Sequence, residues 1–294
     1  MRSKQKKVPD EKSILRTVDK IANLPTIPHV MSEVNRILQS DDMSVTKMAD
    51  VIESDQAITS KILKLVNSAF YGFRSRIIDV RQAIMILGFN TVRNAVSAVS
   101  VIDLFRAREK CDGFDLRDLW RHSIAVAITS KCLAERSRLA IPDDCFVAGL
   151  LHDIGKLVMA VHLPDVFSGV LKLANGEHIS FHEAEKKIIS VDHTVIGGYL
   201  TSKWQFPPRL IEAIMSHHSE NGGASDFGLS GSVFAANIIV NHSGDKESLD
   251  EKLNRRAREF YQVLSHLGTI SSWYPAVAAE IIVASRFFLD DDGL

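Results

Sequence analysis

Cysteine is scarce in this chain, and its spacing excludes two kinds of structural site. The 294 residues contain three cysteines, Cys111, Cys132 and Cys145, with no Cys-x-x-Cys pair. An odd number without such spacing argues against a disulfide framework and against a thiolate zinc site, so we expect reduced, mostly buried thiols. The basic start of the chain, Met1–Lys7, lacks the apolar core of a secretory signal. These features predict a cytoplasmic protein.

An excess of one charge and long hydrophobic runs are also lacking. Lys and Arg total 35 against 36 for Asp and Glu, which argues against a dedicated nucleic-acid binder, although a local patch is not excluded. Charged or amide residues interrupt every apolar stretch before the roughly 18 residues of a membrane span, so we expect no membrane contact. Hydrophobic residues make up 46%, as in an ordinary globular protein large enough to bury a substantial core.

The chain does have helical periodicity along nearly its whole length. The stripe Val30, Met31, Val34, Ile37 and Leu38 places apolar residues three and four apart, which predicts an amphipathic helix. Residues that favour helix N-caps precede several further stretches: Ser44, Asp55, Asp115 and Asp192. Asp79–Gly88 is expected to be another short helix, which the glycine ends. Strand-like alternation is convincing nowhere, so the sequence predicts an all-α protein.

Prolines mark two further helix starts in the second half. Pro142, followed by two aspartates, has the composition of a first helical turn, and we expect its helix to continue through position 156. Pro207-Pro208 predicts a helix that ends at positions 217–218. Further helices are expected over 230–242 and 251–287.

The strongest functional signal is the adjacent pair His152-Asp153. Imidazole nitrogen and carboxylate oxygen together suit first-row divalent ions, and one aspartate can bridge two of them. Other histidines occur where further helices could bring them in: His122 before the pair, then His193 and the doublet His217-His218 after it. This ordered set predicts a metal site assembled from several helices.

Two regions of the chain resemble one family. Leu24–Pro28, Asp55–Tyr71 and Asp79–Gly88 resemble the signature of the HDOD family, and the second half resembles the HD phosphohydrolase superfamily, to which HDOD belongs. The resemblance runs from about residue 16 to 240. It implies a multi-helix HD-like bundle with an N-terminal HDOD helical lobe, of a kind used in bacterial signalling and regulation.

The resemblance also implies a domain organisation. We expect residues 1–15 to be disordered, 16–110 to form the HDOD lobe, and 111–245 to form the HD-like lobe with the metal site. Residues 246–294 are expected to form helices that pack against this body.

The resemblance implies roles for individual histidines. His122 is similar to the first metal ligand of HD enzymes, although alone it would more often be an ordinary core or surface histidine. His193 resembles the histidine that serves a second metal, against the alternative of a solvent-facing residue in a first helical turn. Adjacent helical residues diverge by about 100°, so His217 is a safer candidate than His218, although we expect both near the site.

Two positions qualify this likeness. HD enzymes typically have a last aspartate ligand where this chain has Asn237, which can offer an oxygen but no charge and is a weak candidate. Lys156 follows Asp153 by three residues, so it lies on the same helical side. There it could hold a substrate phosphate or simply form an ion pair with Asp153.

The donor types favour one or two iron, manganese, nickel, cobalt or zinc ions over calcium or magnesium. Six other histidines match nothing that we can assign and are expected to be ordinary: His29, His162, His178, His182, His242 and His266. The cyclic-dinucleotide branch of the superfamily carries a Gly-Tyr-Pro element after its His-His pair, and Ser219–Gly228 does not contain it. Cyclic di-GMP hydrolysis is therefore not predicted.

Three functions compete at this point. The first is a signalling module that binds a partner protein and retains its metal site for structure or sensing. The second is a metal-dependent phosphohydrolase of a nucleotide or other phosphoester, with Asp153 and Lys156 in the chemistry. The third is a metal-free helical scaffold. Many HDOD members have lost the metal ligands, whereas this chain keeps most of them.

Overall fold

The structure is a computed structural model, and it describes most of the chain. The described residues are 12, 14, 16, 19, 29–38, 40–67, 76–106, 110–111, 114–219, 227–243, 250–251, 264 and 266–289. Most of the segment expected to be disordered, 1–15, lies outside them, although Ile14 is helical and buried. The acidic tail after residue 289 also lies outside them.

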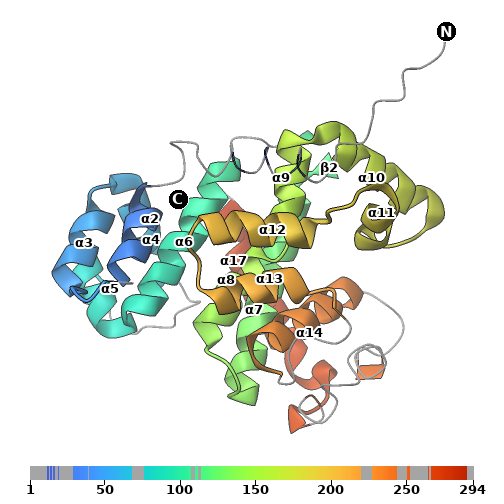
Figure 1. The fold of residues 1–294 in the computed structure, drawn as a ribbon. Helices are drawn as coiled ribbons and strands as arrows, with labels where there is room; N and C mark the ends of the chain where they lie inside the picture. Colours follow the sequence, from blue (N-terminus) through green and yellow to red (C-terminus); the bar gives the residue numbers. More distant parts are fainter. Residues whose placement is uncertain are drawn as a thin grey trace.

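The first helices form a group at one side of the molecule (Figure 1). They are α2 (His29–Leu38), α3 (Val45–Glu53), α4 (Gln56–Val66), α5 (Val80–Leu87) and α6 (Phe89–Arg106). The stripe of α2 is buried at Val30, Met31, Val34 and Ile37. Helix α6 contacts both this group and α8, so it connects the group to the rest of the fold.

The remaining elements form the larger part of the molecule (Figure 1). They are β1 (Lys110–Cys111), β2 (Phe114–Asp115), α7 (Leu116–Ser137), α8 (Pro142–Leu151), α9 (Ile154–His162), α10 (Pro164–Glu177), α11 (Phe181–Ile188), α12 (His193–Lys203), α13 (Pro208–Ser216), α14 (Gly228–His242) and α17 (Ile270–Leu289). The two short strands pair antiparallel, with Cys111 opposite Phe114. The prediction of an all-α fold is confirmed.

Helix starts follow the predicted caps. The side chain of Ser44 accepts a hydrogen bond from the backbone N–H of Lys47, and that of Asp55 accepts from Ala57 and Ile58. Asp115 and Asp192 cap α7 and α12 in the same way. Asp79, expected to be within its helix, caps α5 as well. Each cap satisfies backbone donors that have no partner within the helix. Gly88 ends α5 with a φ of 83°, a conformation that glycine adopts without strain.

The prediction of one helix from Pro142 through position 156 is wrong in one respect: the helix is interrupted at His152-Asp153. α8 ends at Leu151, and α9 begins at Ile154. Asp153, between them, has φ −99° and ψ 13°, outside the helical values. The Nδ1 atom of His152 lies 2.7 Å from the carbonyl oxygen of Gly149 and occupies an acceptor of the last turn of α8. His152 keeps a helical backbone, and Asp153 is the residue that leaves the helical conformation.

The core centres on α7 and α8, which pack closely together. A Cβ atom on Gly149 of α8 would lie only 2.7 Å from the Cα of Ala127 on α7, so glycine allows this crossing. The segment Pro142–His162 is long and on average apolar enough to cross a membrane, although Asp153 and Lys156 interrupt it, and 83% of its apolar part is buried inside the protein. That burial is typical of a core segment.

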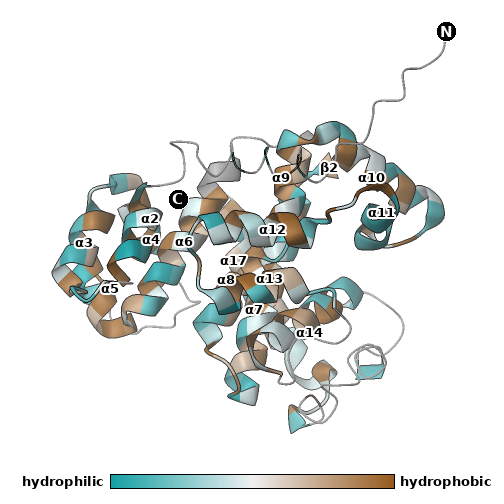
Figure 2. Ribbon diagram, viewed as in Figure 1, coloured by the Kyte–Doolittle hydropathy of each residue, from teal (hydrophilic) through white to brown (hydrophobic). Residues whose placement is uncertain are grey.

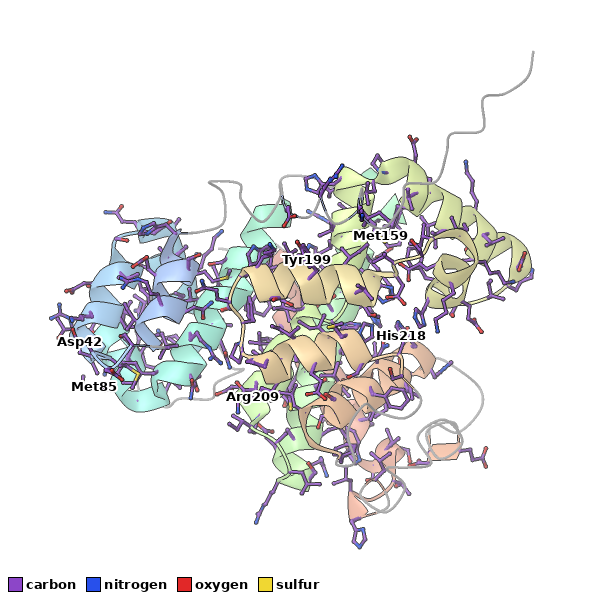
Figure 3. All side chains as sticks on the ribbon, in the orientation of Figure 1. Asp42, Met85, Met159, Tyr199, Arg209 and His218 are labelled. Atoms are coloured by element: carbon purple, nitrogen blue, oxygen red, sulfur yellow. The ribbon has the colours of Figure 1, made fainter. Side chains whose placement is uncertain are left out.

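A buried polar cluster joins the two parts of the fold. Asp144 of α8 is 1% exposed and lies within 3.3 Å of Arg93 on α6 and 2.5 Å of Arg209 on α13. Asn94 donates to the same carboxylate at 3.1 Å. Figure 3 labels Arg209 at the start of α13, the helix that leads to the histidine doublet. Because a buried charge is costly without partners, this cluster holds α6, α8 and α13 in one arrangement.

The cysteines whose side chains are described lie on α7 and α8. Cys132 is half-buried, Cys145 is buried, and both are free. Burial raises the pKa of the Cys145 thiol to about 12, so this thiol stays protonated at neutral pH. The side chain of Cys111 lies outside the described residues.

Candidate metal centre

The structure brings the sequence-predicted residues together in the interior. His152 and Asp153 lie between α8 and α9, His193 begins α12, and His217 directly follows α13. His152 and His193 are 0% exposed, and Asp153 and His217 are 1% exposed. His122 projects from α7 and keeps 22% of its side chain exposed. The solvent-facing alternative for His193 is thereby excluded.

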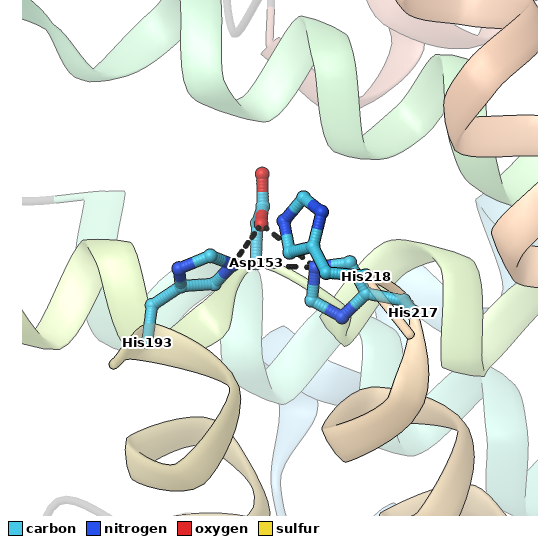
Figure 4. A group of neighbouring side chains, drawn as sticks. All are labelled: Asp153, His193, His217 and His218. Carbon is cyan, nitrogen blue, oxygen red and sulfur yellow. Dashed lines mark hydrogen bonds and ion pairs between the residues drawn. The ribbon is translucent and has the colours of Figure 1, made fainter. Parts of the chain in front are cut away.

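One oxygen of Asp153 faces two imidazoles (Figure 4). Its Oδ1 atom lies 3.2 Å from Nε2 of His193 and 3.5 Å from Nε2 of His217. The two Nε2 atoms are themselves 3.2 Å apart. His218 also offers a ligand atom, and the four residues together have such atoms within 4.8 Å of one another. We call Asp153, His193, His217 and His218 the Oδ1 half-site.

The other oxygen of Asp153 faces a second group. Its Oδ2 atom lies 3.3 Å from Nε2 of His152 and 3.8 Å from Nε2 of His122. We call Asp153, His122 and His152 the Oδ2 half-site. The Oδ1 atom of Asn237 lies 3.1 Å from Nε2 of His122, so the asparagine does face this half-site. It also accepts a hydrogen bond from Nδ2 of Asn241.

Hydrogen bonds on the far side of the rings set which nitrogen faces inward. Nδ1 of His152 donates to the carbonyl oxygen of Gly149, and Nδ1 of His217 donates to that of Ile214, each at 2.7 Å. Because a carbonyl can only accept, the hydrogen must sit on Nδ1. The Nε2 atoms of both rings are thus left as acceptors that point at the carboxylate of Asp153.

These donor atoms fit a divalent metal ion. Ligand bonds of about 2.0–2.2 Å place neighbouring ligand atoms about 3.0–3.5 Å apart around one ion, and the Oδ1 half-site shows separations of 3.2, 3.2 and 3.5 Å. Within the described part of the chain, the buried Nε2 atoms of His152 and His218 have no hydrogen-bond partner. Acceptor atoms that meet in this way need a cation or added protons between them.

The electrostatics favour the ionisation states that metal ligands require at Asp153, His122 and His217, but not at His193. Burial lowers the pKa of His122 and of His217 to about 3, which keeps both rings neutral. Burial would raise the pKa of Asp153, but His152 and Lys156 outweigh it and hold that pKa well below its usual value. For His193 burial opposes the charged form, yet Glu185 and Asp153 raise its pKa. The pocket is thus set for an ionised carboxylate.

Lys156 pairs with Asp153. Its Nζ atom lies 2.7 Å from Oδ2 of Asp153 and 5.5 Å from the centre of the Phe181 ring, with 16% of the side chain exposed. This is the ion pair that the spacing of three residues allows. The side chain is thus mostly buried against the centre.

Glycine sets the approach of the elements that carry the centre. A Cβ atom on Gly155 would lie 2.0 Å from the carbonyl oxygen of His193. The start of α9 therefore meets the start of α12 backbone to backbone, which side chains of any size would prevent. This contact holds His193 beside Asp153.

Two residues of the centre were missed from the sequence. Glu185 on α11 is 0% exposed and contacts His193. His182, expected to be ordinary, lies 3.1 Å from Asp192 and stacks on His218 with ring centres 4.3 Å apart. Figure 2 shows α11 as largely hydrophilic. The buried Glu185 therefore does not stand out in sequence from the other charged residues of this helix. The available signal was spacing, because Glu185 lies four residues after Phe181 on the apolar side of its helix.

Known structures share this fold. A Shewanella amazonensis protein named "Putative phosphohydrolase" is 24% identical, with a TM-score of 0.71 over 94% of this chain and 96% of its own. A Geobacter sulfurreducens HDOD domain protein with unknown function is also 24% identical, with a TM-score of 0.70 over 92% and 98%. At this identity the likeness shows the fold alone.

Sequence relatives are similarly distant. An uncharacterized protein of Treponema pallidum is 24% identical over 84% of this chain, and the chain spans only 48% of that protein's length. Residues 24–220, which are more than half of the chain, match the HDOD domain. This match includes the first-half motifs and every candidate ligand except Asn237. The chain belongs to the HDOD family.

Proposed function

We propose that this chain is a regulatory HDOD module that holds one or two divalent transition-metal ions around Asp153. The observation that carries the proposal is the meeting of Oδ1 of Asp153 with the Nε2 atoms of His193 and His217, at 3.2 and 3.5 Å in a buried pocket. Nitrogen and oxygen donors of this kind suit iron, manganese, cobalt, nickel or zinc.

The two half-sites are expected to differ in strength. The Oδ1 half-site offers three imidazoles, with His193 and His217 at 3.2 and 3.5 Å from the carboxylate oxygen. The Oδ2 half-site offers two, at 3.3 and 3.8 Å, and has the neutral Asn237 at its edge. Asp153 is the only carboxylate among the predicted ligands, so charge neutralisation is incomplete for two ions. We therefore expect one ion to be held firmly and a second loosely.

A protein partner is the other part of the proposal. Ile78, Met85 and Ile86 are 71%, 69% and 50% exposed at and just before α5. Met85 and Ile86 are adjacent residues of α5, and Ile78 lies two residues before the helix begins. Figure 3 labels Met85 at the outer side of the first group of helices. Large exposed apolar residues grouped together are typical of a protein contact surface.

Hydrolysis of a phosphoester is the second candidate. It is supported by the two carboxylate oxygens of Asp153, each of which faces one half-site, because this arrangement suits a pair of ions. The ammonium group of Lys156, 2.7 Å from Oδ2, supports it as well. Bound divalent ions would supply Lewis acidity toward a phosphoryl group. Lys156 would then release part of its contact with Asp153 and hold a phosphoryl oxygen. The name of the Shewanella relative is consistent with this chemistry.

One preparation separates these functions. The protein is purified without chelator, its metal content is measured by elemental analysis, and wild type and Asp153→Ala are assayed against a panel of phosphoesters. Metal without turnover supports the regulatory module. Metal with turnover that Asp153→Ala abolishes supports the hydrolase. A wild type that takes up no metal even after reconstitution contradicts both proposals and leaves a helical scaffold.

A further inference from the structure

Glu185 is a buried carboxylate that none of the predicted roles uses. It lies on α11, it is 0% exposed, and both of its oxygens contact one residue. Oε1 accepts a hydrogen bond from the backbone N–H of His193 at 3.0 Å, and Oε2 lies 2.5 Å from Nδ1 of the same residue. A carboxylate held at both oxygens by one residue is fixed in orientation.

This contact determines which nitrogen of His193 faces the centre. Because a carboxylate accepts hydrogen bonds, Nδ1 carries the hydrogen, and Nε2 is the atom presented to Oδ1 of Asp153. Rotation of the ring would break the 2.5 Å contact and leave the buried carboxylate with only the backbone N–H of His193 as its partner. The side chain therefore has one orientation in which it can bind a metal ion.

Glu185 differs from the groups that support the neighbouring rings. His152 and His217 donate their Nδ1 hydrogens to backbone carbonyl oxygens, whereas His193 donates to a carboxylate. A negative acceptor increases the electron-donating power of the opposite nitrogen more than a neutral one does. It also brings a second negative charge close to the Oδ1 half-site, where Asp153 supplies the first.

We infer that Glu185 is the positioning residue for metal binding: it fixes His193 as an Nε2 ligand and makes the Oδ1 half-site the tighter of the two. The inference rests on the proposed metal centre and assigns a role within it. The segment α10–α11, which contributes no predicted ligand, thereby becomes part of the metal centre.

The test compares Glu185→Gln with wild type, using Co²⁺ alone as the probe. Glutamine keeps the shape and one acceptor but removes the charge. We expect the affinity of the tighter site to fall about 10- to 100-fold, with a changed absorption spectrum of the bound Co²⁺. The matched control is Glu177→Gln at the end of α10. The side chain of Glu177 is 46% exposed and forms an ion pair with Lys187 of α11. This variant should bind Co²⁺ as wild type does.

The outcomes separate the two proposals. A wild type that binds no Co²⁺ overturns the metal centre and this inference with it. A wild type that binds, together with a Glu185→Gln variant of unchanged affinity and spectrum, overturns the inference alone. Should Glu185→Gln fail to fold, the histidine ¹⁵N shifts of Zn²⁺-loaded wild type decide. Hydrogen on Nδ1 and metal on Nε2 of His193 support the inference, and the reverse assignment refutes it.

Discussion

The substitution Asp153→Asn should abolish metal-induced stabilisation while changing the metal-free protein much less. Asp153 is 1% exposed, and its two oxygens face both half-sites. Asparagine has the same shape but removes the only carboxylate that the two groups share. In the metal-free protein the substitution weakens the 2.7 Å contact with Lys156 and the 3.2 Å contact with His193, while the amide oxygen keeps one acceptor in place.

The size of the metal-induced rise in Tm follows from the linkage between metal binding and folding. An ion present at 100 times its dissociation constant stabilises the folded state by about 2.7 kcal/mol. For a protein of this size each kcal/mol raises Tm by about 2–4 °C, so wild type should gain roughly 5–10 °C. Asp153→Asn should gain less than about 1 °C at the same concentration, because its dissociation constant would exceed the metal concentration.

The assay is thermal unfolding with and without Mn²⁺ at neutral pH. The matched control is Asp55→Asn at the start of α4, where asparagine caps a helix about as well as aspartate. This control should keep the full metal-induced rise in Tm. A full rise in Asp153→Asn would refute the reasoning, because it would place the ion away from the shared carboxylate.

Three further perturbations test other parts of the account. Asn237→Asp places a carboxylate about where an oxygen now lies 3.1 Å from His122 and should tighten the weaker metal site by at least about tenfold in calorimetric titration; unchanged binding would remove position 237 from the site. Because the pKa of His122 and of His217 is lowered to about 3, the unfolded chain binds more protons below pH 6.5. Between pH 7 and 5.5 these two residues should lower the free energy of unfolding of the metal-free protein by about 2.5 kcal/mol. His193, whose pKa is raised, should offset part of this loss, and urea unfolding that shows no loss at pH 5.5 would contradict the buried neutral rings. Gly155→Ala puts a methyl group against the carbonyl oxygen of His193 and should lower the free energy of unfolding by about 1–3 kcal/mol, measured with urea. A variant as stable as wild type would show that α9 and α12 can move apart without cost.

Much of the fold could be predicted from local sequence. Capping residues such as Asp55, Asp115 and Asp192 start helices at the expected positions, because their side chains satisfy backbone donors within a few residues. The break between α8 and α9 could not be predicted in this way. At the break Asp153 leaves the helical conformation, and Nδ1 of His152 lies 2.7 Å from the carbonyl oxygen of Gly149. Apolar periodicity continues across it.

The candidate site was predictable only as far as its residue types. The His-Asp pair and the outlying histidines carry their chemistry in their identity, and the resemblance to HD enzymes supplied their order. Glu185 could not be found in this way, because α11 carries several charged residues and only the spacing from Phe181 distinguishes the buried one. The contact of Gly155 with His193 likewise depends on packing between residues far apart in the sequence.

Anomalous diffraction from crystals of the protein loaded with Mn²⁺ tests the central claim most directly. The account predicts a peak within bonding distance, about 2.0–2.3 Å, of Oδ1 of Asp153 and of Nε2 of His193 and His217, with any second, weaker peak beside Oδ2. Peaks only on surface carboxylates, with none beside Asp153, would contradict it.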